Sequence, residues 1–255
     1  MNPAMADSGD VIHVSSPRKP IMIVLAGRTF PAISAKQGDF DDWIARGLGD
    51  SVPQVRIDAR VATELPTPHA LAGVVVSGSH AMVSHRESWS ERLGQWMRAC
   101  VEARVPVLGI CYGHQLLAHA FGGRVDDLPG GPEVGTKRIR LNQDARKDPL
   151  MEGLPAIFPA QLVHYQSVLE LPHEAVLLAS SDAEPNQAFR IETCGWGVQF
   201  HPEFSPEAMR GYLGEMSATL DGAQALASQV ESTHAACSVL ERFAEMTHSQ
   251  PEPED

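Results

Sequence analysis

The sequence predicts an α/β protein with a doubly wound, mostly parallel central sheet, flanking helices, a small antiparallel extension and a helical C-terminus. Three observations lead to this fold class. Short apolar runs recur in the first half of the chain, segments with helical spacing separate them, and short strand patterns with Gly and Pro turns begin after Gly122. Strands that alternate with helices imply right-handed crossovers, which place successive strands parallel to one another. With 255 residues, of which 43% are hydrophobic, the chain can bury one large core.

Four apolar runs are predicted to be strands that are buried on both faces, as the strands of a parallel sheet are. They span residues 21–27, 52–58, 72–78 and 105–110. The first run follows a basic flank and could be mistaken for the apolar part of a signal peptide. Its seven residues lie at the lower limit for such a segment and are far too few to cross a membrane. We therefore expect a buried first strand and no membrane segment.

Two segments between these strands, 39–48 and 87–103, carry apolar residues at helical spacing and are predicted to be amphipathic helices. Their apolar faces comprise Phe40, Trp43, Ile44 and Leu48 in the first segment and Trp89, Leu93, Trp96, Met97, Cys100 and Val101 in the second.

After Gly122 the pattern changes to short strands and then to helices. Helical spacing returns over 205–220 and 223–247, and the Ala-rich stretch 223–236 is predicted to be a surface helix with one apolar stripe. The strand candidates are 135–141, 161–172, 175–180, 186–191 and 196–200.

These patterns divide the chain into four parts. The polar segment 1–19 and the acidic, proline-interrupted segment 249–255 are predicted to be flexible ends. Residues 20–220 form the main domain, and residues 221–248 form a C-terminal helical extension.

Charge and cysteine usage exclude several classes of function. Twenty Lys and Arg against 32 Asp and Glu give a formal net charge of −12, which repels a phosphate backbone and argues against general nucleic-acid binding. The four cysteines form no C-x-x-C pair, so their spacing predicts neither a metal site nor a disulfide framework and favours a reducing cytoplasm. The stretch 130–137 only approaches a phosphate-loop pattern and is predicted to be a turn followed by a strand, so no cofactor is expected.

The segment VPVLGICYGHQLLAHAFGG is predicted to be a strand, a sharp turn and a helix, with Cys111 at the junction. Such an elbow holds a nucleophile out of the sheet in a strained conformation, and Gly109 and Gly113 remove side chains that would collide around it. The start of the helix, expected near Gly113, places backbone N–H groups beside the sulfur and favours thiolate over thiol. A small buried thiol is the alternative for an isolated cysteine, but the flanking glycines disfavour it.

The segment GVQFHPEF is predicted to deliver His201 and Glu203 from a short strand into a loop. Residues two apart in extended backbone point the same way, so Glu203 could hold one ring nitrogen of His201 and leave the other for a thiol. A surface turn is the alternative for this tripeptide alone. Together with the elbow cysteine, the pattern favours a Cys111, His201 and Glu203 triad.

The elbow GICYGHQ and the segment GVQFHPEF resemble the two signature motifs of the class I glutamine amidotransferases, and the similarity covers roughly residues 20–215. This resemblance implies a cysteine nucleophile at Cys111, a general base and acid at His201, and an orienting carboxylate at Glu203. The loop VVVSGSH is similar to the family's oxyanion loop, so Gly78 and Tyr112 would supply the backbone N–H donors.

The resemblance also implies where the substrate binds. Gln115 matches a substrate-contacting glutamine of the elbow motif, and the segment HYQSV is similar to a stretch that holds the α-amino and α-carboxylate groups. Gln166 and Ser167 are the candidates there. His114 and His119 follow the nucleophile on the predicted helix and are expected to pack or cap rather than to catalyse.

The implied reaction is hydrolysis of the glutamine side-chain amide through a cysteine thioester, which releases glutamate and ammonia. Only about 50 residues follow the HPEF motif, too few for a synthetase domain, so the ammonia acceptor would be a separate subunit. The segment GDFDDW resembles stand-alone relatives of the glutaminase domain of GMP synthase, some of which cleave other γ-glutamyl bonds. A free-standing γ-glutamyl hydrolase or peptidase therefore stays open, as do a non-catalytic regulatory subunit and a homo-oligomer.

Overall fold

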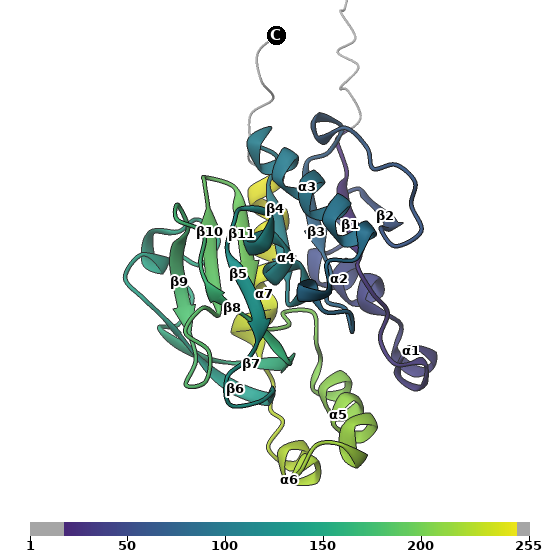
Figure 1. The fold of residues 1–255 in the computed structure, drawn as a ribbon, viewed down its shortest axis with the longest axis vertical. Coiled ribbons are helices and arrows are strands. Elements are labelled where there is room, and N and C mark those ends of the chain that lie inside the picture. The colour runs from purple at the N-terminus through teal and green to yellow at the C-terminus, as the bar shows by residue number, and fades with distance from the viewer. Residues whose placement is uncertain (1–17, 249–255) are drawn as a thin grey trace, which may run out of the picture.

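The computed structural model describes residues 18–248, which form a nine-stranded sheet, a two-stranded sheet and surrounding helices (Figure 1). The strand order of the large sheet is β2-β1-β3-β4-β11-β10-β9-β6-β7. Strands β2 to β11 of this order are parallel where they meet, and every pairing from β11 through to β7 is antiparallel. The predicted fold class, a mostly parallel α/β sheet with an antiparallel extension, is confirmed.

The parallel half is built from buried aliphatic strands. Strands β1, β3 and β4 are buried at every position, as their continuous apolar sequences require. Helix α4 lies in front of the sheet in Figure 1 and α7 passes behind it, so the sheet is covered on both faces. The elements of this half are β1 (Ile21–Leu25), α1 (Pro31–Gln37), α2 (Phe40–Leu48), β2 (Gln54–Asp58), β3 (Gly73–Val76), α3 (Ser88–Glu102), β4 (Val107–Ile110) and α4 (Tyr112–Ala120).

The prediction of a doubly buried strand over 52–58 was wrong. Strand β2 is the edge of the sheet, has no fully buried residue and leaves Val55 39% exposed. Its polar residues Gln54 and Arg56 reflect this position: Arg56 Nη1 lies 2.8 Å from Asp41 Oδ2 on α2. Charge on an edge strand also discourages pairing with another sheet.

The amphipathic segments form the helices that were predicted. Phe40, Trp43, Ile44 and Leu48 are all buried on α2. Asp39 caps this helix, because its side chain accepts from Phe40 N–H and the Asp42 carboxylate accepts from the Asp39 backbone.

The antiparallel half follows the change of pattern after Gly122. A separate small sheet pairs β5 with β8 in front of it. The elements are β5 (Arg124–Asp127), β6 (Glu133–Leu141), β7 (Ile157–His164), β8 (Gln166–Glu170), β9 (Val176–Ser180), β10 (Ala188–Ile191) and β11 (Gly195–Val198).

The C-terminal helical pattern is interrupted twice. Helix α5 (Pro206–Glu215) continues into the short 3₁₀ turn η4 (Met216–Ala218), and α6 (Ala223–Ser228) is separated from α7 (His234–His248). The prediction of one surface helix over 223–236 was therefore wrong. Helix α7 belongs to the main core, because Val239, Leu240 and Phe243 are buried within it and α7 packs on α2 and β7.

The predicted flexible ends fall almost wholly outside the described residues: only Arg18 and Lys19 of the first and none of 249–255 are described. No helix among residues 18–248 is both long enough and apolar enough to cross a membrane.

Candidate active site

Cys111 sits at the sharp turn between β4 and α4, with φ 51° and ψ −97°. A positive φ is strained for a residue with a side chain, so the surroundings must impose it. The Cys111 N–H donates to Val198 O over 2.8 Å, which ties the elbow to the end of β11. A Cβ on Gly109 would lie 2.3 Å from Gly113 O, and one on Gly113 would lie 2.6 Å from Val76 O. The glycines are required because backbone meets backbone at this turn.

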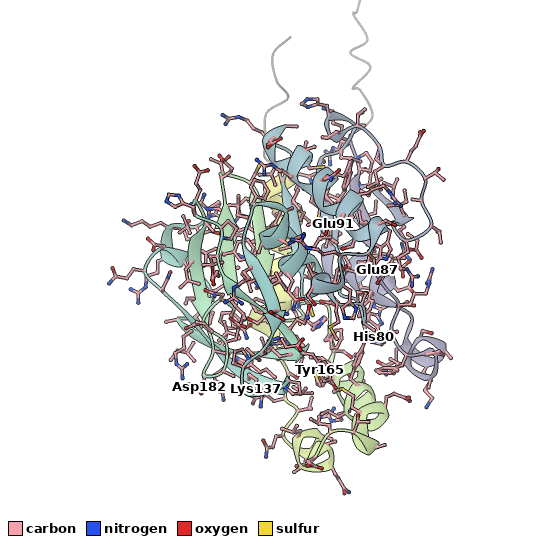
Figure 2. All side chains as sticks on the ribbon, in the orientation of Figure 1. His80, Glu87, Glu91, Lys137, Tyr165 and Asp182 are labelled. Carbon is pink, nitrogen blue, oxygen red and sulfur yellow. The ribbon has the colours of Figure 1, made fainter. Side chains whose placement is uncertain are left out.

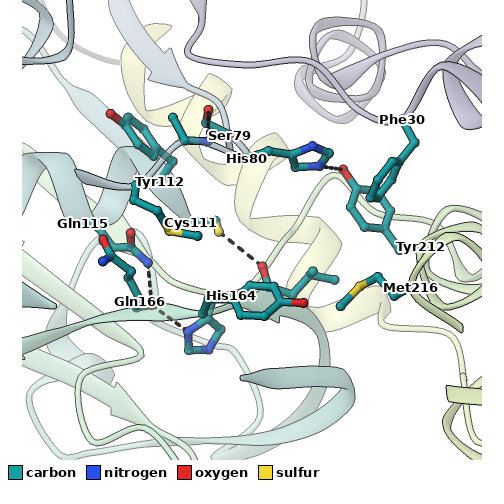
Figure 3. A pocket seen from close by; sticks show the side chains of 14 residues that line it. Phe30, Ser79, His80, Cys111, Tyr112, Gln115, His164, Gln166, Tyr212 and Met216 are labelled. Carbon is teal, nitrogen blue, oxygen red and sulfur yellow. Dashed lines mark hydrogen bonds between the residues drawn. The ribbon is translucent and has the colours of Figure 1, made fainter. Parts of the chain in front are cut away.

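The Cys111 side chain is 5% exposed and lines a cavity of about 150 Å³ (Figure 3). Its Sγ lies 3.6 Å from Val163 O, on the opposite wall of the cavity. Helix α4 begins at Tyr112, one residue earlier than expected, so the first free N–H groups of the helix follow the sulfur directly.

His201 and Glu203 follow the end of β11 and form a buried pair. His201 Nδ1 lies 2.7 Å from Glu203 Oε1, with side chains 3% and 0% exposed. The His201 N–H donates to Gln161 O over 2.8 Å and so fastens this loop to β7. The predicted local geometry of these two residues is confirmed.

The electrostatics of His201 favour the charged imidazolium. Burial alone lowers its pKa, but the charge of Glu203, the charge of Cys111 and hydrogen bonds to both residues outweigh burial and raise the pKa to about 10. The ring is held in place by Phe204, which stacks on it with centroids 4.1 Å apart. His201 is thus coupled to a carboxylate on one side and a thiol on the other.

Gly78 lies against both of these side chains. A Cβ at Gly78 would be 3.0 Å from His201 Cε1 and 3.8 Å from Cys111 Cβ, so a larger residue would displace the imidazole. The Gly78 carbonyl accepts from the Ser77 hydroxyl over 2.9 Å, and Ser77 Oγ accepts from Ala26 N–H, which fixes the loop to β1. Gly78 and Tyr112 are therefore both adjacent to Cys111, as an oxyanion site would require.

Gln115 and Gln166 line the cavity, as predicted for substrate contacts. Gln115 Nε2 donates to Gln166 O over 2.7 Å and to Gln199 Oε1 over 3.0 Å. The Gln166 amide donates to Ser84 Oγ and to Asp127 Oδ1, at 2.6 and 3.0 Å. These hydrogen bonds hold both amides rigidly in the wall.

Ser167 is not brought to the cavity. It is 0% exposed, and its hydroxyl donates to the buried carboxylate of Glu184. Neighbouring residues of a strand face opposite sides, so once Gln166 faces the cavity Ser167 must face away from it. The sequence expectation for Ser167 is corrected by this orientation.

His114 and His119 stay away from the cavity. His114 is 0% exposed and packs on Phe189, and burial lowers its pKa to about 3. His119 Nε2 lies 2.9 Å from Glu91 Oε1. Their packing roles were predicted.

Sequence reasoning missed the buried ion pair behind the cavity wall. His164 Nδ1 lies 2.9 Å from Gln166 O, which can only accept, and Nε2 lies 3.1 Å from Glu133 Oε2. The Glu133 carboxylate also accepts from Ser181 Oγ and Gln187 Nε2, at 2.7 and 2.8 Å. Both ring nitrogens therefore donate, and His164 is an imidazolium paired with Glu133. The histidine stands in the quoted motif HYQSV, but its partner lies on another strand.

A second missed feature is the aromatic side of the cavity, formed by Phe30, His80, Tyr212 and Met216. These residues come from a loop after β1, the loop after β3, α5 and η4. Only His80 stood within a quoted motif, two residues after Gly78. Among residues 18–248, no group of three His, Cys, Asp or Glu side chains is placed to hold a metal ion.

Comparison with known proteins extends this geometry. A family model described as glutamine amidotransferase class-I matches residues 42–216. GMP synthase [glutamine-hydrolyzing] of Aeropyrum pernix is 38% identical over 172 residues, which cover 65% of this chain and 31% of that protein. The chain therefore spans about a third of the length of this relative.

Gamma-glutamyl peptidase 5 of Arabidopsis thaliana is 33% identical over 144 residues, covering 54% of this chain and 55% of that one. A crystal structure of a glutamine amidotransferase from Thermotoga maritima superposes with a TM-score of 0.72 at 18% identity. The superposition covers 92% of this chain and 100% of that one, so the two share their fold.

Proposed function

Because the chain belongs to the class-I glutamine amidotransferases, which are cysteine-dependent amide hydrolases, we propose Cys111 as nucleophile, His201 as general base and acid, and Glu203 as the carboxylate that orients His201. The observation that carries this proposal is the buried 2.7 Å contact between His201 and Glu203 beside a strained cysteine elbow. An imidazolium of raised pKa stabilises a neighbouring thiolate, which is the reactive form.

In the proposed reaction, the Cys111 thiolate attacks the carbonyl carbon of the glutamine side-chain amide. The backbone N–H groups of Gly78 and Tyr112 donate to the oxyanion, a contribution typically worth about 10²- to 10³-fold in rate per donor. His201 then protonates the leaving nitrogen, and ammonia departs from a γ-glutamyl thioester. Water, deprotonated by His201, attacks the thioester carbon to release glutamate and restore the thiolate.

Gln115 and Gln166 are the proposed contacts for the glutamyl part of the substrate, because both line the cavity and are held in place by hydrogen bonds. Ser167 is left out of this set because its hydroxyl is buried on the other side of β8.

The proposed acceptor of the ammonia is bound by a separate synthetase protein. Support comes from the relative of Aeropyrum pernix, because this chain aligns with only 31% of that GMP synthase. The second candidate function is a free-standing γ-glutamyl hydrolase or peptidase. It is favoured by the similarity to a plant γ-glutamyl peptidase and by the aromatic side of the cavity.

Turnover by purified protein distinguishes these functions. We expect release of glutamate from glutamine, and Cys111→Ala should reduce kcat/KM by at least about 10⁴-fold without lowering the thermal midpoint. Cys194→Ala is the matched control, since it removes another buried thiol at the start of β11, and should retain activity. Turnover that survives in Cys111→Ala would contradict the proposed mechanism. Lack of turnover by the native protein on both glutamine and γ-glutamyl peptides, alone and with lysate, would favour a non-catalytic regulatory subunit.

A further inference from the structure

We propose that the cavity beside Cys111 contains a leaving-group subsite, formed by Phe30, His80, Tyr212 and Met216, that takes an uncharged apolar or aromatic amine. The inference rests on the proposed function and names its substrate class: γ-glutamyl amides of hydrophobic amines.

The four side chains form a continuous wall (Figure 3). The Phe30 ring centroid lies 4.6 Å from that of His80 and 5.2 Å from that of Tyr212. His80 Nε2 lies 3.4 Å from the Tyr212 hydroxyl, which accepts from Thr29 Oγ1 over 3.0 Å. Since these rings are joined by contacts and hydrogen bonds, the wall exists before a ligand arrives, and little ordering is needed on binding.

The wall lies on the side of the cavity from which the leaving nitrogen departs. Phe204 stacks on His201 at 4.1 Å and contacts Tyr212 at 5.0 Å between ring centroids. His201 is thus joined to the aromatic wall through one ring. Because His201 must protonate the leaving nitrogen, the substituent on that nitrogen faces Tyr212 and its neighbours.

The opposite wall has different chemistry. Gln115, His164 and Gln166 lie on that side, with their amide and imidazole groups held by hydrogen bonds. Polar groups of this kind suit the glutamyl part of a substrate, whereas the aromatic wall offers contact area with one hydroxyl and one imidazole. The two sides therefore accept two chemically different halves of one molecule.

The charges of the cavity narrow the leaving amine. None of the described residues that line it is Asp, Glu, Lys or Arg. Partial burial and the positive charge of His201 lower the pKa of His80, so this ring is neutral near pH 7 and accepts from the Tyr212 hydroxyl. A leaving amino acid would place its carboxylate here without a cation to pair with. Ammonia would leave the apolar surface uncovered.

His80 and Tyr165 are the exposed members of the lining, and Figure 2 labels them on the side of the molecule that faces α5. An amine that extends past the four-residue wall would emerge between them into solvent. The subsite is therefore open at its outer end and admits amines of different length.

A substrate series on the native protein tests the proposal without any substitution. We would measure kcat/KM for glutamine, γ-glutamyl methylamide, γ-glutamyl benzylamide and γ-glutamylglycine. The expected order places the benzylamide at least about ten-fold above glutamine, because its ring is buried against the wall, and γ-glutamylglycine below the methylamide. Equal values for glutamine and the benzylamide, or a preference for γ-glutamylglycine, would overturn the proposal.

Two variants locate the effect. Phe30→Ala and Met216→Ser should each lower the ratio of benzylamide to glutamine kcat/KM by about five-fold or more, since each removes contact area from the wall. Ile157→Ser is the control, because this side chain is 56% exposed on β7 outside the cavity, and should leave the ratio unchanged. An unchanged ratio in both wall variants would contradict the assignment. The parent mechanism is judged separately: loss of all turnover in Cys111→Ala supports it even where the native protein shows no preference for the benzylamide.

Discussion

The two halves of the sheet meet at the cavity but are stabilised differently. The parallel strands β1, β3 and β4 bury aliphatic side chains at every position. The antiparallel half buries a polar cluster beside its hydrocarbon, with the His164–Glu133 ion pair at its centre. The parallel half therefore positions the nucleophile through backbone contacts, and the antiparallel half positions the substrate wall through charge and hydrogen bonds.

Strand β11 is the boundary between these halves, since it pairs parallel with β4 and antiparallel with β10. It receives the Cys111 N–H at Val198 and leads into His201 and Glu203. A perturbation at this boundary should have the largest effect on activity, a steric change in the parallel half a mixed effect, and a charge change in the antiparallel half an effect mainly on stability.

At the boundary, Glu203→Gln should lower kcat/KM by about 10³-fold, because the amide cannot hold the imidazolium as the carboxylate does. Loss of the Glu203 charge removes the largest factor that raises the pKa of His201, while burial still lowers it. The basic limb of the pH–rate profile should therefore move to lower pH. In the native protein the folded-state pKa of about 10 exceeds the usual 6.5, so the associated stability is present below about pH 6.5 and is lost as the pH rises through about 10. A basic limb that stays in place in Glu203→Gln would contradict the pairing.

In the parallel half, Gly109→Ala should lower the free energy of unfolding by about 3 kcal/mol, because its Cβ would meet backbone atoms of Gly113 at 2.3 Å. Displacement of the elbow should also reduce kcat/KM by about 10²-fold. Gly214→Ala on α5 is the matched control: a Cβ there meets nothing within 4 Å, so this helix should be unchanged or slightly more stable. Chemical denaturation and turnover of both variants check the prediction, and equal stability of the two would show that the turn can relax.

In the antiparallel half, Glu133→Gln should lower the free energy of unfolding by about 3 kcal/mol or more, since it leaves the buried His164 imidazolium without its carboxylate. Glu170→Gln is the control, because Glu170 pairs with Arg124 at 2.7 Å on the surface, where such pairs contribute at most about 1 kcal/mol. A similar small loss in both variants would mean that His164 is neutral and that the cluster carries no charge.

The smallest effect is expected at Glu184, which accepts from Ser167 and Asn186 N–H behind β8. Burial raises the pKa of Glu184 to about 7, so the folded state favours the protonated acid. Its contribution to stability is fully present below about pH 4.5 and is lost as the pH rises through about 7. Glu184→Gln stays neutral, so its thermal midpoint relative to the native protein should rise by about 2 to 4 °C between pH 5.5 and 8.5. A difference that does not depend on pH would contradict the assignment.

The same division governs how much could be predicted. The elbow at Cys111 was readable because glycine at 109 and 113 is demanded by contacts within one short segment. The pairing of His201 with Glu203 was readable because residues two apart in extended backbone share a face. Helix α2 was readable from its apolar spacing and its Asp39 cap.

By itself, then, the sequence determined the α/β class, the nucleophile elbow and the local histidine–carboxylate pair, because each depends on residues close together in the chain. Only the tertiary structure decided that β2 is an edge strand, that Ser167 faces Glu184, and that Glu133 charges His164. It also decided the aromatic wall, whose members Phe30 and Met216 stand far apart in sequence. Burial, facing and charge at these places depend on which distant segments pack together, and no local spacing encodes that choice.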